Sequence, residues 1–174
     1  MPESGSPDPG QAAPVAMAVP GGGHVLPIVL HPDPVLRMRC DPAGDLTNAQ
    51  IRQLSADLLA TMYAAGGRGL AAPQLGILRR AFVMDAGWKE GAPAPLVLLD
   101  PEIAARPDAE MEEAVERCLS IPDRPVMVRR PLAVRICWYD LDGVQHRRVM
   151  TGIEARIAQH EADHLDGRLI LDFP

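Results

Sequence analysis

The segment T-G-I-E-A-R-I-A-Q-H-E-A-D-H-L-D-G, residues 151–167, constrains the fold most strongly, because its pattern predicts a helix with defined ends. Thr151 and Glu154 have the spacing of an N-terminal capping box, and a glycine closes the segment where a helix C-terminus is expected. Residues four apart on a helix project from nearly the same face. His160 and His164 can therefore reach one metal ion together.

Glu161 follows the first histidine and is turned by about 100° around the helix axis. It would thus flank a metal held by the two histidines, which is the position of a base that acts on a metal-activated water. Asp163 lies off the shared face and is expected behind the site or at the surface. The alternative interpretation is a solvent-exposed helix face that merely carries two histidines.

A catalytic zinc-type site usually has three protein ligands and one open position. The two histidines leave one ligand to be found. Few residues follow Gly167, and only Asp172 among them offers a ligand atom, so the third ligand is expected mainly upstream. Spacing alone leaves several carboxylates and three other candidates open: Cys118, Cys137 and His146.

The rest of the chain predicts a compact α+β domain over residues 26–174, with small, mainly antiparallel sheets around the histidine helix. A second helix begins with the capping box of Thr47 and Gln50 and ends near Ala65. The segment up to about residue 150 is mostly strand: it contains two short apolar runs, then an alternating pattern over residues 132–139, a turn and a hairpin partner. Residues 1–25 are rich in Pro, Gly, Ala and Ser and are expected to form a flexible tail, within which Met17 is a second candidate start.

Composition excludes several classes of function. A net charge of −6 argues against a broad electrostatic grip on nucleic acid or anionic lipid. No apolar run has the length of a membrane span, and no Lys or Arg precedes Arg37, so a secretory signal is not indicated. Three cysteines at wide spacing make a poor disulfide framework, and the cytoplasm is the expected compartment.

Three separated motifs resemble those of the peptide deformylases. G-R-G-L-A-A-P-Q-L-G at residues 67–76 is similar to the family's G-x-G-L-A-A-x-Q-x-G. E-R-C-L-S at residues 116–120 is similar to E-G-C-L-S, and Q-H-E-A-D-H-L-D-G at residues 159–167 is similar to Q-H-E-x-D-H-L-x-G. The motifs occur in the family's order, and the resemblance spans about residues 26–173.

The resemblance implies a role for each motif. Cys118 becomes the third metal ligand beside His160 and His164, and Cys40 and Cys137 remain structural. Glu161 becomes the general base and acid, and the Gln74 side-chain amide and the Leu119 backbone N–H stabilise the oxyanion. The residues implied to bind the substrate are Gly67, Arg68, Gly69, Glu116 and Arg117.

The family's reaction removes the formyl group from the N-terminal formyl-methionine of nascent polypeptides and releases formate. By resemblance, the cofactor is one divalent metal ion, with Fe(2+) expected in the cell and Zn(2+), Ni(2+) or Co(2+) also suited to a Cys-His-His site. N-formylated nascent peptides are the expected partners, with no nucleic acid and no membrane. Many relatives carry a basic C-terminal helix that contacts the ribosome, and docking by that route is not expected for this sequence.

Two positions depart from the family pattern. Arg117 stands where the second motif usually has glycine, and Arg68 replaces an aliphatic residue in the first motif. Both would place a cation at the substrate cleft. They leave two alternatives open: a deformylase-like amidohydrolase with a different substrate, and a catalytically weak homologue that only binds metal or peptide.

Overall fold

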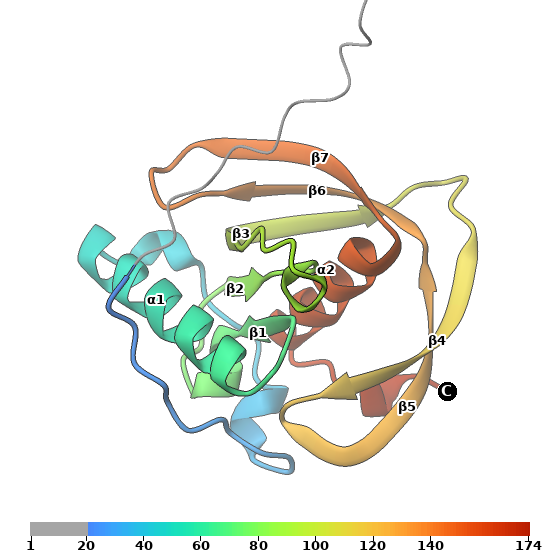
Figure 1. Cartoon of the computed structure of the whole chain (residues 1–174), viewed down its shortest axis with the longest axis horizontal. Helices are drawn as coiled ribbons and strands as arrows, with labels where there is room; N and C mark the ends of the chain where they lie inside the picture. Colours follow the sequence, from blue (N-terminus) through green and yellow to red (C-terminus); the bar gives the residue numbers. More distant parts are fainter. Residues whose placement is uncertain (1–20) are drawn as a thin grey trace, which may run out of the picture.

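The computed structural model describes residues 21–174 and contains two α-helices, seven strands and five short 3-10 helices in that range (Figure 1). The α-helices are α1 (Asn48–Ala64) and α2 (Gly152–Leu165). The strands are β1 (Gly69–Ala71), β2 (Ala81–Met84), β3 (Leu96–Ala105), β4 (Met111–Cys118), β5 (Ile121–Pro131), β6 (Ala133–Tyr139) and β7 (Gln145–Thr151). The 3-10 helices are Pro34–Arg37, Ala43–Asp45, Ala72–Leu75, Trp88–Glu90 and Ile170–Asp172.

The strands form two antiparallel sheets. One sheet has five strands in the order β1-β2-β3-β6-β7, and the other contains only β4 and β5. β1 pairs only with β2, and β4 pairs only with β5, so within residues 21–174 each of these two strands keeps one free edge. Free edges expose unpaired backbone groups that an extended peptide can bind.

The five-stranded sheet is covered on both faces near β2. Phe82 and Met84 belong to the core that contains the buried face of α2, whereas Ala81 and Val83 belong to the core that contains α1. This explains why β2 is a continuous apolar run rather than an alternating one: both of its faces are buried. In Figure 1, α2 lies between this sheet and the β4–β5 hairpin, so its two sides face different sheets.

The α+β architecture predicted from the sequence is confirmed. On β6 the inward residues Val134, Ile136 and Trp138 are buried and the intervening Arg135 is exposed, as the alternation predicts. β7 returns as the antiparallel hairpin partner of β6. The helix α1 begins with the predicted capping box, in which Gln50 N donates to Thr47 Oγ1 at 3.3 Å.

The capping box predicted at the start of α2 is wrong. The Thr151 side chain makes no capping hydrogen bond in the described part of the chain. The Glu154 carboxylate instead accepts from Arg148 Nη2 at 2.7 Å. Gly152, the first residue of the helix, has a φ of +57°, so the chain turns into α2 directly from β7 through a backbone conformation that favours glycine.

Most of the predicted tail, residues 1–20, lies outside the described residues. The remaining part of that segment runs along α1, where His24 N donates to Asp57 Oδ1 at 2.8 Å. Leu26 N donates to Thr61 Oγ1 at 2.9 Å. Across residues 21–174, neither α-helix has the length and apolar character needed to cross a bilayer.

Candidate metal centre and active site

Helix α2 carries both histidines on one face, as the sequence predicts. The ring centroids of His160 and His164 are 5.1 Å apart. His164 is buried, with 2% of its surface exposed, and Glu161 is 5% exposed. The helix therefore directs two imidazoles and one carboxylate into the interior at the edge of a cleft.

Cys118, the last residue of β4, completes the cluster. Its Sγ atom lies 3.4 Å from His164 Nε2, and one ligand atom each from Cys118, His160 and His164 lie within 4.8 Å of one another. Of the third-ligand candidates that spacing left open, Cys118 is the one that the fold brings to the histidines. The others lie elsewhere: His146 bonds to Asp140 at 2.7 Å, and Cys137 donates to Glu102 at 3.7 Å.

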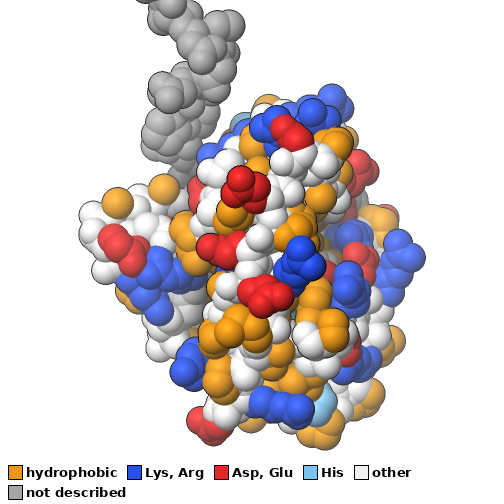
Figure 2. Space-filling view, turned by 90° about the vertical axis from the view of Figure 1, so that its right-hand side faces the viewer, with side chains coloured by type: hydrophobic (Ala, Val, Ile, Leu, Met, Phe, Trp, Pro, Cys, Tyr) orange, Lys and Arg blue, Asp and Glu red, His pale blue; other side chains and the backbone are white. Residues whose placement is uncertain are grey.

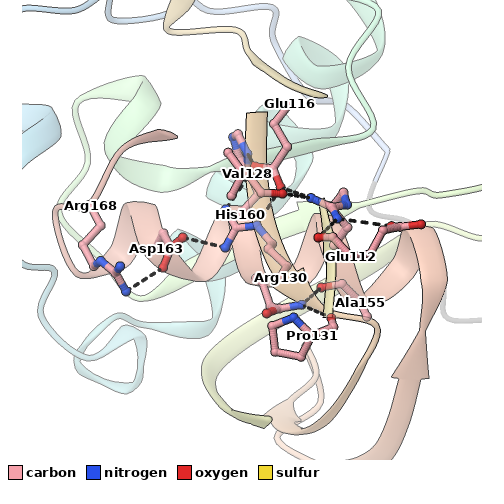
Figure 3. A network of polar contacts seen from close by, with 11 residues as sticks. Glu112, Glu116, Val128, Arg130, Pro131, Ala155, His160, Asp163 and Arg168 are labelled. Atoms are coloured by element: carbon pink, nitrogen blue, oxygen red, sulfur yellow. Dashed lines mark hydrogen bonds and ion pairs between the residues drawn. The ribbon is translucent and has the colours of Figure 1, made fainter. Parts of the chain in front are cut away.

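Glu116 forms a hydrogen bond with His160 on the side of the ring away from the metal cluster (Figure 3). Its Oε2 atom accepts from His160 Nδ1 at 2.9 Å, which leaves His160 Nε2 directed at the cluster. The same carboxylate accepts from Arg130 Nε at 2.6 Å and from Arg156 Nη1 at 2.9 Å. Glu116 was predicted to bind substrate, but its side chain is 6% exposed and fully engaged by these three groups. We infer that it positions His160.

The network continues along α2. Arg130 Nη1 donates to Asp163 Oδ2 at 2.9 Å, and Arg168 lies on the other side of that aspartate at 3.4 Å (Figure 3). Asp163 is therefore a group behind the site, one of the two positions expected for it. Sequence reasoning missed Arg130 and Arg156. A signal existed for Arg156, which stands one helical turn before His160 and so on the histidine face.

Glu116→Gln is expected to lower metal affinity by about 10–100-fold, the usual cost of removing a hydrogen-bonding group behind a ligand. The amide cannot balance the charges of Arg130 and Arg156, and it orients His160 less strongly. Competition with a chelator measures the affinity. Glu113→Gln, on the exposed face of the same strand, is the matched control and should bind metal as the wild type does. Equal affinity in the two variants would show that Glu116 does not position the ligand.

Burial shapes the protonation of the inner groups. It raises the pKa of Glu161 to about 7, and the nearby charge of His160 offsets this only in part. Burial also lowers the pKa of His164 well below its usual value, which keeps the imidazole neutral. Neutral imidazole is the form that binds a metal ion.

The outer groups are controlled by hydrogen bonding. Burial alone would raise the pKa of Glu116, but hydrogen bonds from His160 and Arg130 outweigh it and lower the pKa to about 2. For His160, burial lowers the pKa, whereas contacts with Cys118 and Glu116 raise it to about 10. The site therefore stabilises a positive charge at His160, and a cation at Nε2 can take the place of that proton.

The backbone of β1 passes directly over Glu161, and this requires glycine at position 69. A Cβ atom on Gly69 would overlap the Glu161 side chain, with the carboxyl carbon only 2.8 Å away. Glu161 Oε2 is buried and has no hydrogen-bond partner within residues 21–174. A carboxylate oxygen held without a partner is poised to accept a proton from a small molecule in the cleft.

Gly69→Ala is expected to displace Glu161 and, with Glu161 in the role that the family resemblance implies, to lower kcat by about 100-fold, the effect of misplacing a reacting group by about 1 Å. Overpacking should also reduce the free energy of unfolding by about 1–3 kcal/mol. Rate assays and denaturant titration measure the two effects. Gly21→Ala, where the added carbon meets no atom within 4 Å, is the control. An unchanged rate in Gly69→Ala would contradict this role of the glycine.

Gln74 is buried, with 2% of its surface exposed, so it is not a surface residue of its loop. Its Oε1 accepts from Ala71 N at 2.9 Å, and this bond fixes the orientation of the amide. Its Nε2 donates to Ser120 Oγ at 3.1 Å and lies 3.7 Å from Cys118 Sγ. The amide nitrogen is thus directed at the metal cluster. Its two partners, Cys118 and Ser120, flank Leu119 in the sequence.

A cleft of about 520 Å³ opens onto these groups. Its walls combine residues 66–69 at the start of β1, residues 115–118 of β4, residues 121–125 of β5 and one face of α2. The predicted substrate-binding residues Gly67, Arg68, Gly69, Glu116 and Arg117 all line it, together with Gln74, Cys118, Leu119, His160 and Glu161. The fold therefore brings every predicted site residue except the buried His164 to one cavity.

The donor set fits a divalent transition metal. One thiol and two imidazoles are the ligand types that zinc and its neighbours prefer, and three protein ligands would leave one position of a bound ion for water or substrate. His160 is fixed by Glu116, as metal-bound histidines usually are by a carboxylate. A buried Cys-His-His cluster beside a carboxylate and an open cleft has the groups of a metal-dependent hydrolase.

Comparison with known proteins identifies the family. The family model for polypeptide deformylase matches residues 25–173. A peptide deformylase of Mesorhizobium japonicum is 41% identical over 148 residues, which covers 85% of this chain and 83% of the relative. The crystal structure of peptide deformylase from Thermotoga maritima superposes with a TM-score of 0.78 at 37% identity, covering 86% of this chain and 97% of that one.

A second solved structure, a Met-Ala-Ser-bound class I type b peptide deformylase from Acinetobacter baumannii, gives a TM-score of 0.79 at 32% identity. It covers 88% of this chain and 100% of that chain. The protein belongs to the polypeptide deformylase family, metalloenzymes that remove the N-formyl group from nascent peptides. Its function is that hydrolysis, and the alternatives of a different amide substrate or a mere binding module are not favoured.

Proposed function

We propose that Cys118, His160 and His164 bind the single catalytic metal ion and that Glu161 transfers the protons of the deformylation reaction. The observation that carries this proposal is the meeting of one sulfur and two imidazole nitrogens within 4.8 Å at the end of the cleft. When bound, the ion supplies Lewis acidity, which acidifies a water molecule and polarises the formyl oxygen.

Glu161 then acts as base and later as acid. Burial raises the pKa of this carboxyl, which favours proton uptake by Glu161 over permanent ionisation. It takes the proton from the attacking water and delivers it to the departing amine, the new peptide N-terminus. Gly69 holds the β1 backbone close beside this carboxylate.

Gln74 and Leu119 stabilise the oxyanion that forms at the formyl carbon. The Gln74 amide is oriented through Ala71, which directs its Nε2 toward Cys118, and the long contact to Cys118 Sγ is the one that the oxyanion would replace. Leu119 follows Cys118 directly and lines the same cleft, and its backbone N–H is the second proposed donor. Each such donor contributes about 10²–10³ in rate when the surroundings exclude water.

The peptide binds in extended form between β1 and β4. Gly69 begins β1 and Arg117 lies on β4, and each of these strands has one unpaired edge within residues 21–174, so the substrate backbone can add as a strand; Gly67 and Arg68 line the cleft just before β1. The tripeptide named for the Acinetobacter baumannii structure is a ligand of this kind in a similar protein. Arg68 is held at the cleft wall by Glu90, with Nη2 and Oε1 2.5 Å apart.

Fe(2+) is the proposed metal in the cell, with Zn(2+), Ni(2+) or Co(2+) able to occupy the same ligands. Formylated nascent chains are the proposed partners, and the cytoplasm, where such chains are made, is the proposed location. We propose residues 26–174 as the catalytic domain, and no nucleic acid or ribosome contact is part of the proposal.

Formate release from formyl-Met-Ala-Ser tests the proposal. The protein is purified without oxygen, its metal content is measured, and portions are reloaded with each of the four metals. Turnover that disappears on chelation and returns with metal is expected. Turnover that persists without metal would contradict the proposed role of the cluster.

A further inference from the structure

An irregularity in the β4–β5 hairpin shapes the mouth of the cleft. Between the paired positions Glu116↔Val126 and Cys118↔Ile121, β4 contributes one residue, Arg117, whereas β5 contributes residues 122–125. Such bulges redirect side chains and are frequent next to active sites. The whole bulge, P-D-R-P, lines the cleft opposite Arg117. In Figure 2, which views the molecule from the side of this hairpin, charged groups stand among exposed hydrophobic ones.

The backbone of the bulge is well defined by its sequence. A proline stands at each end and fixes the local φ, and Asp123 adopts a φ of +66°, the left-handed region that aspartate tolerates better than most residues. Arg124 follows it on the exposed side. The hairpin thus presents two exposed arginines, Arg117 and Arg124, from neighbouring strands.

The cations at the cleft divide into paired and unpaired groups. Arg68 forms an ion pair with Glu90, and Arg156 forms ion pairs with Glu112 and Glu116. Three lining cations form no ion pair with a carboxylate within residues 21–174: Lys89, Arg117 and Arg124.

The acidic groups that face these cations are few. Asp123 is the one exposed acid among the lining residues, since Glu116 is buried against Arg130 and Arg156 and Glu161 lies at the metal cluster. Three unpaired cations against one exposed acid leave a local positive excess. The chain as a whole carries a net charge of −6, so this excess is a local feature and not a consequence of composition.

We propose that Arg117 and Arg124 make the enzyme prefer formylated peptides with acidic side chains after the first residue. This inference rests on the proposed function, which puts the formyl group at the metal. A peptide extended along β4 from that point carries its following residues outward past Arg117 and the bulge. Exposed ion pairs change affinity modestly, so each arginine should contribute about two- to fivefold in kcat/KM.

The first measurement compares kcat/KM for three peptides: formyl-Met-Ala-Ser, formyl-Met-Glu-Glu and formyl-Met-Lys-Lys. The metal-loaded enzyme should favour the Glu peptide over the neutral one and disfavour the Lys peptide. Raising the ionic strength from about 0.02 M to about 0.5 M should bring the three values together, since salt screens charges at the surface. Equal values at low salt would overturn the proposal.

The second measurement uses variants. Arg117→Gln and Arg124→Gln should each lower the ratio of the Glu peptide to the neutral peptide, and the double variant should abolish the preference. Arg135→Gln is the control: it removes one positive charge from the exposed side of β6, and Arg135 does not line the cleft. Its ratio of kcat/KM for the Glu peptide to that for the neutral peptide should equal the wild-type ratio. The measured quantity is the ratio of two kcat/KM values from the same variant. A general loss of activity lowers both values and leaves their ratio unchanged. An unchanged ratio in the double variant would refute the role of the two arginines.

A binding measurement separates this inference from the proposed function. Calorimetry with the unformylated peptides Met-Ala-Ser, Met-Glu-Glu and Met-Lys-Lys gives the charge preference without turnover. If the neutral formyl peptide is not hydrolysed, the proposed function fails while the order of affinities still tests the arginines. If it is hydrolysed but the Glu peptide binds no better, only the preference fails.

Discussion

Glu161→Gln is expected to lower kcat by about 10²–10⁴-fold, the usual contribution of a general acid–base group, while metal still binds. Glutamine has nearly the same shape, so it fits beneath Gly69 and leaves the histidines in place. It cannot accept a proton, however, because the amide lacks the ionisable carboxyl whose pKa burial raises to about 7. Single-turnover assays with formyl-Met-Ala-Ser, together with metal analysis, measure both properties.

Glu154→Gln is the matched control, because it makes the same change on the same helix. Glu154 pairs with Arg148 at the partly exposed start of α2, far along the helix from the cluster. Its rate should stay at the wild-type value. If Glu161→Gln retained full activity with metal bound, another group would have to carry the proton.

Cys118→Ser is expected to reduce metal affinity strongly, because it removes a proposed ligand. Loss of a group that only hydrogen-bonds to a ligand costs about 10–100-fold in affinity, and this loss should be larger. A hydroxyl is a harder and weaker donor than a thiolate at such a site. Activity should fall with metal occupancy and recover only in part at high metal concentration. Chelator competition and formate release, measured on the same samples, test the two parts together.

Cys137→Ser makes the same substitution on β6, where the thiol donates to Glu102 outside the cluster. It should bind metal and turn over as the wild type does. Loss of metal in this variant, or full metal affinity in Cys118→Ser, would show that the cluster is not the metal site.

Local sequence signals predicted the elements whose causes are themselves local. The capping box of Thr47 and Gln50 sets the start of α1, and the alternation on β6 sets its buried face. The histidine spacing predicted the shared face on α2, because helix periodicity alone determines it. The capping box predicted at Thr151 is absent: Glu154 accepts from Arg148 on the preceding strand, and the chain enters the helix through Gly152 with a φ of +57°.

Long-range contacts could not be read from spacing. The position of Cys118 beside the histidines depends on how β4 approaches α2, and only the resemblance to a family chose it over Cys137 and His146. Arg130 reaches Glu116 from a paired strand, and no local pattern marks that contact. The bulge opposite Arg117 arises from the register of β4 and β5, which neither strand determines alone.

X-ray absorption spectroscopy of the zinc-loaded protein tests the metal site most directly. The account predicts one sulfur at about 2.3 Å and two imidazole nitrogens at about 2.0–2.1 Å from the ion. The sulfur contribution to the spectrum should be absent in Cys118→Ser and present in Cys137→Ser. A first coordination shell without sulfur in the wild type, or one with a sulfur that survives Cys118→Ser, would contradict the proposed centre and the chemistry that depends on it.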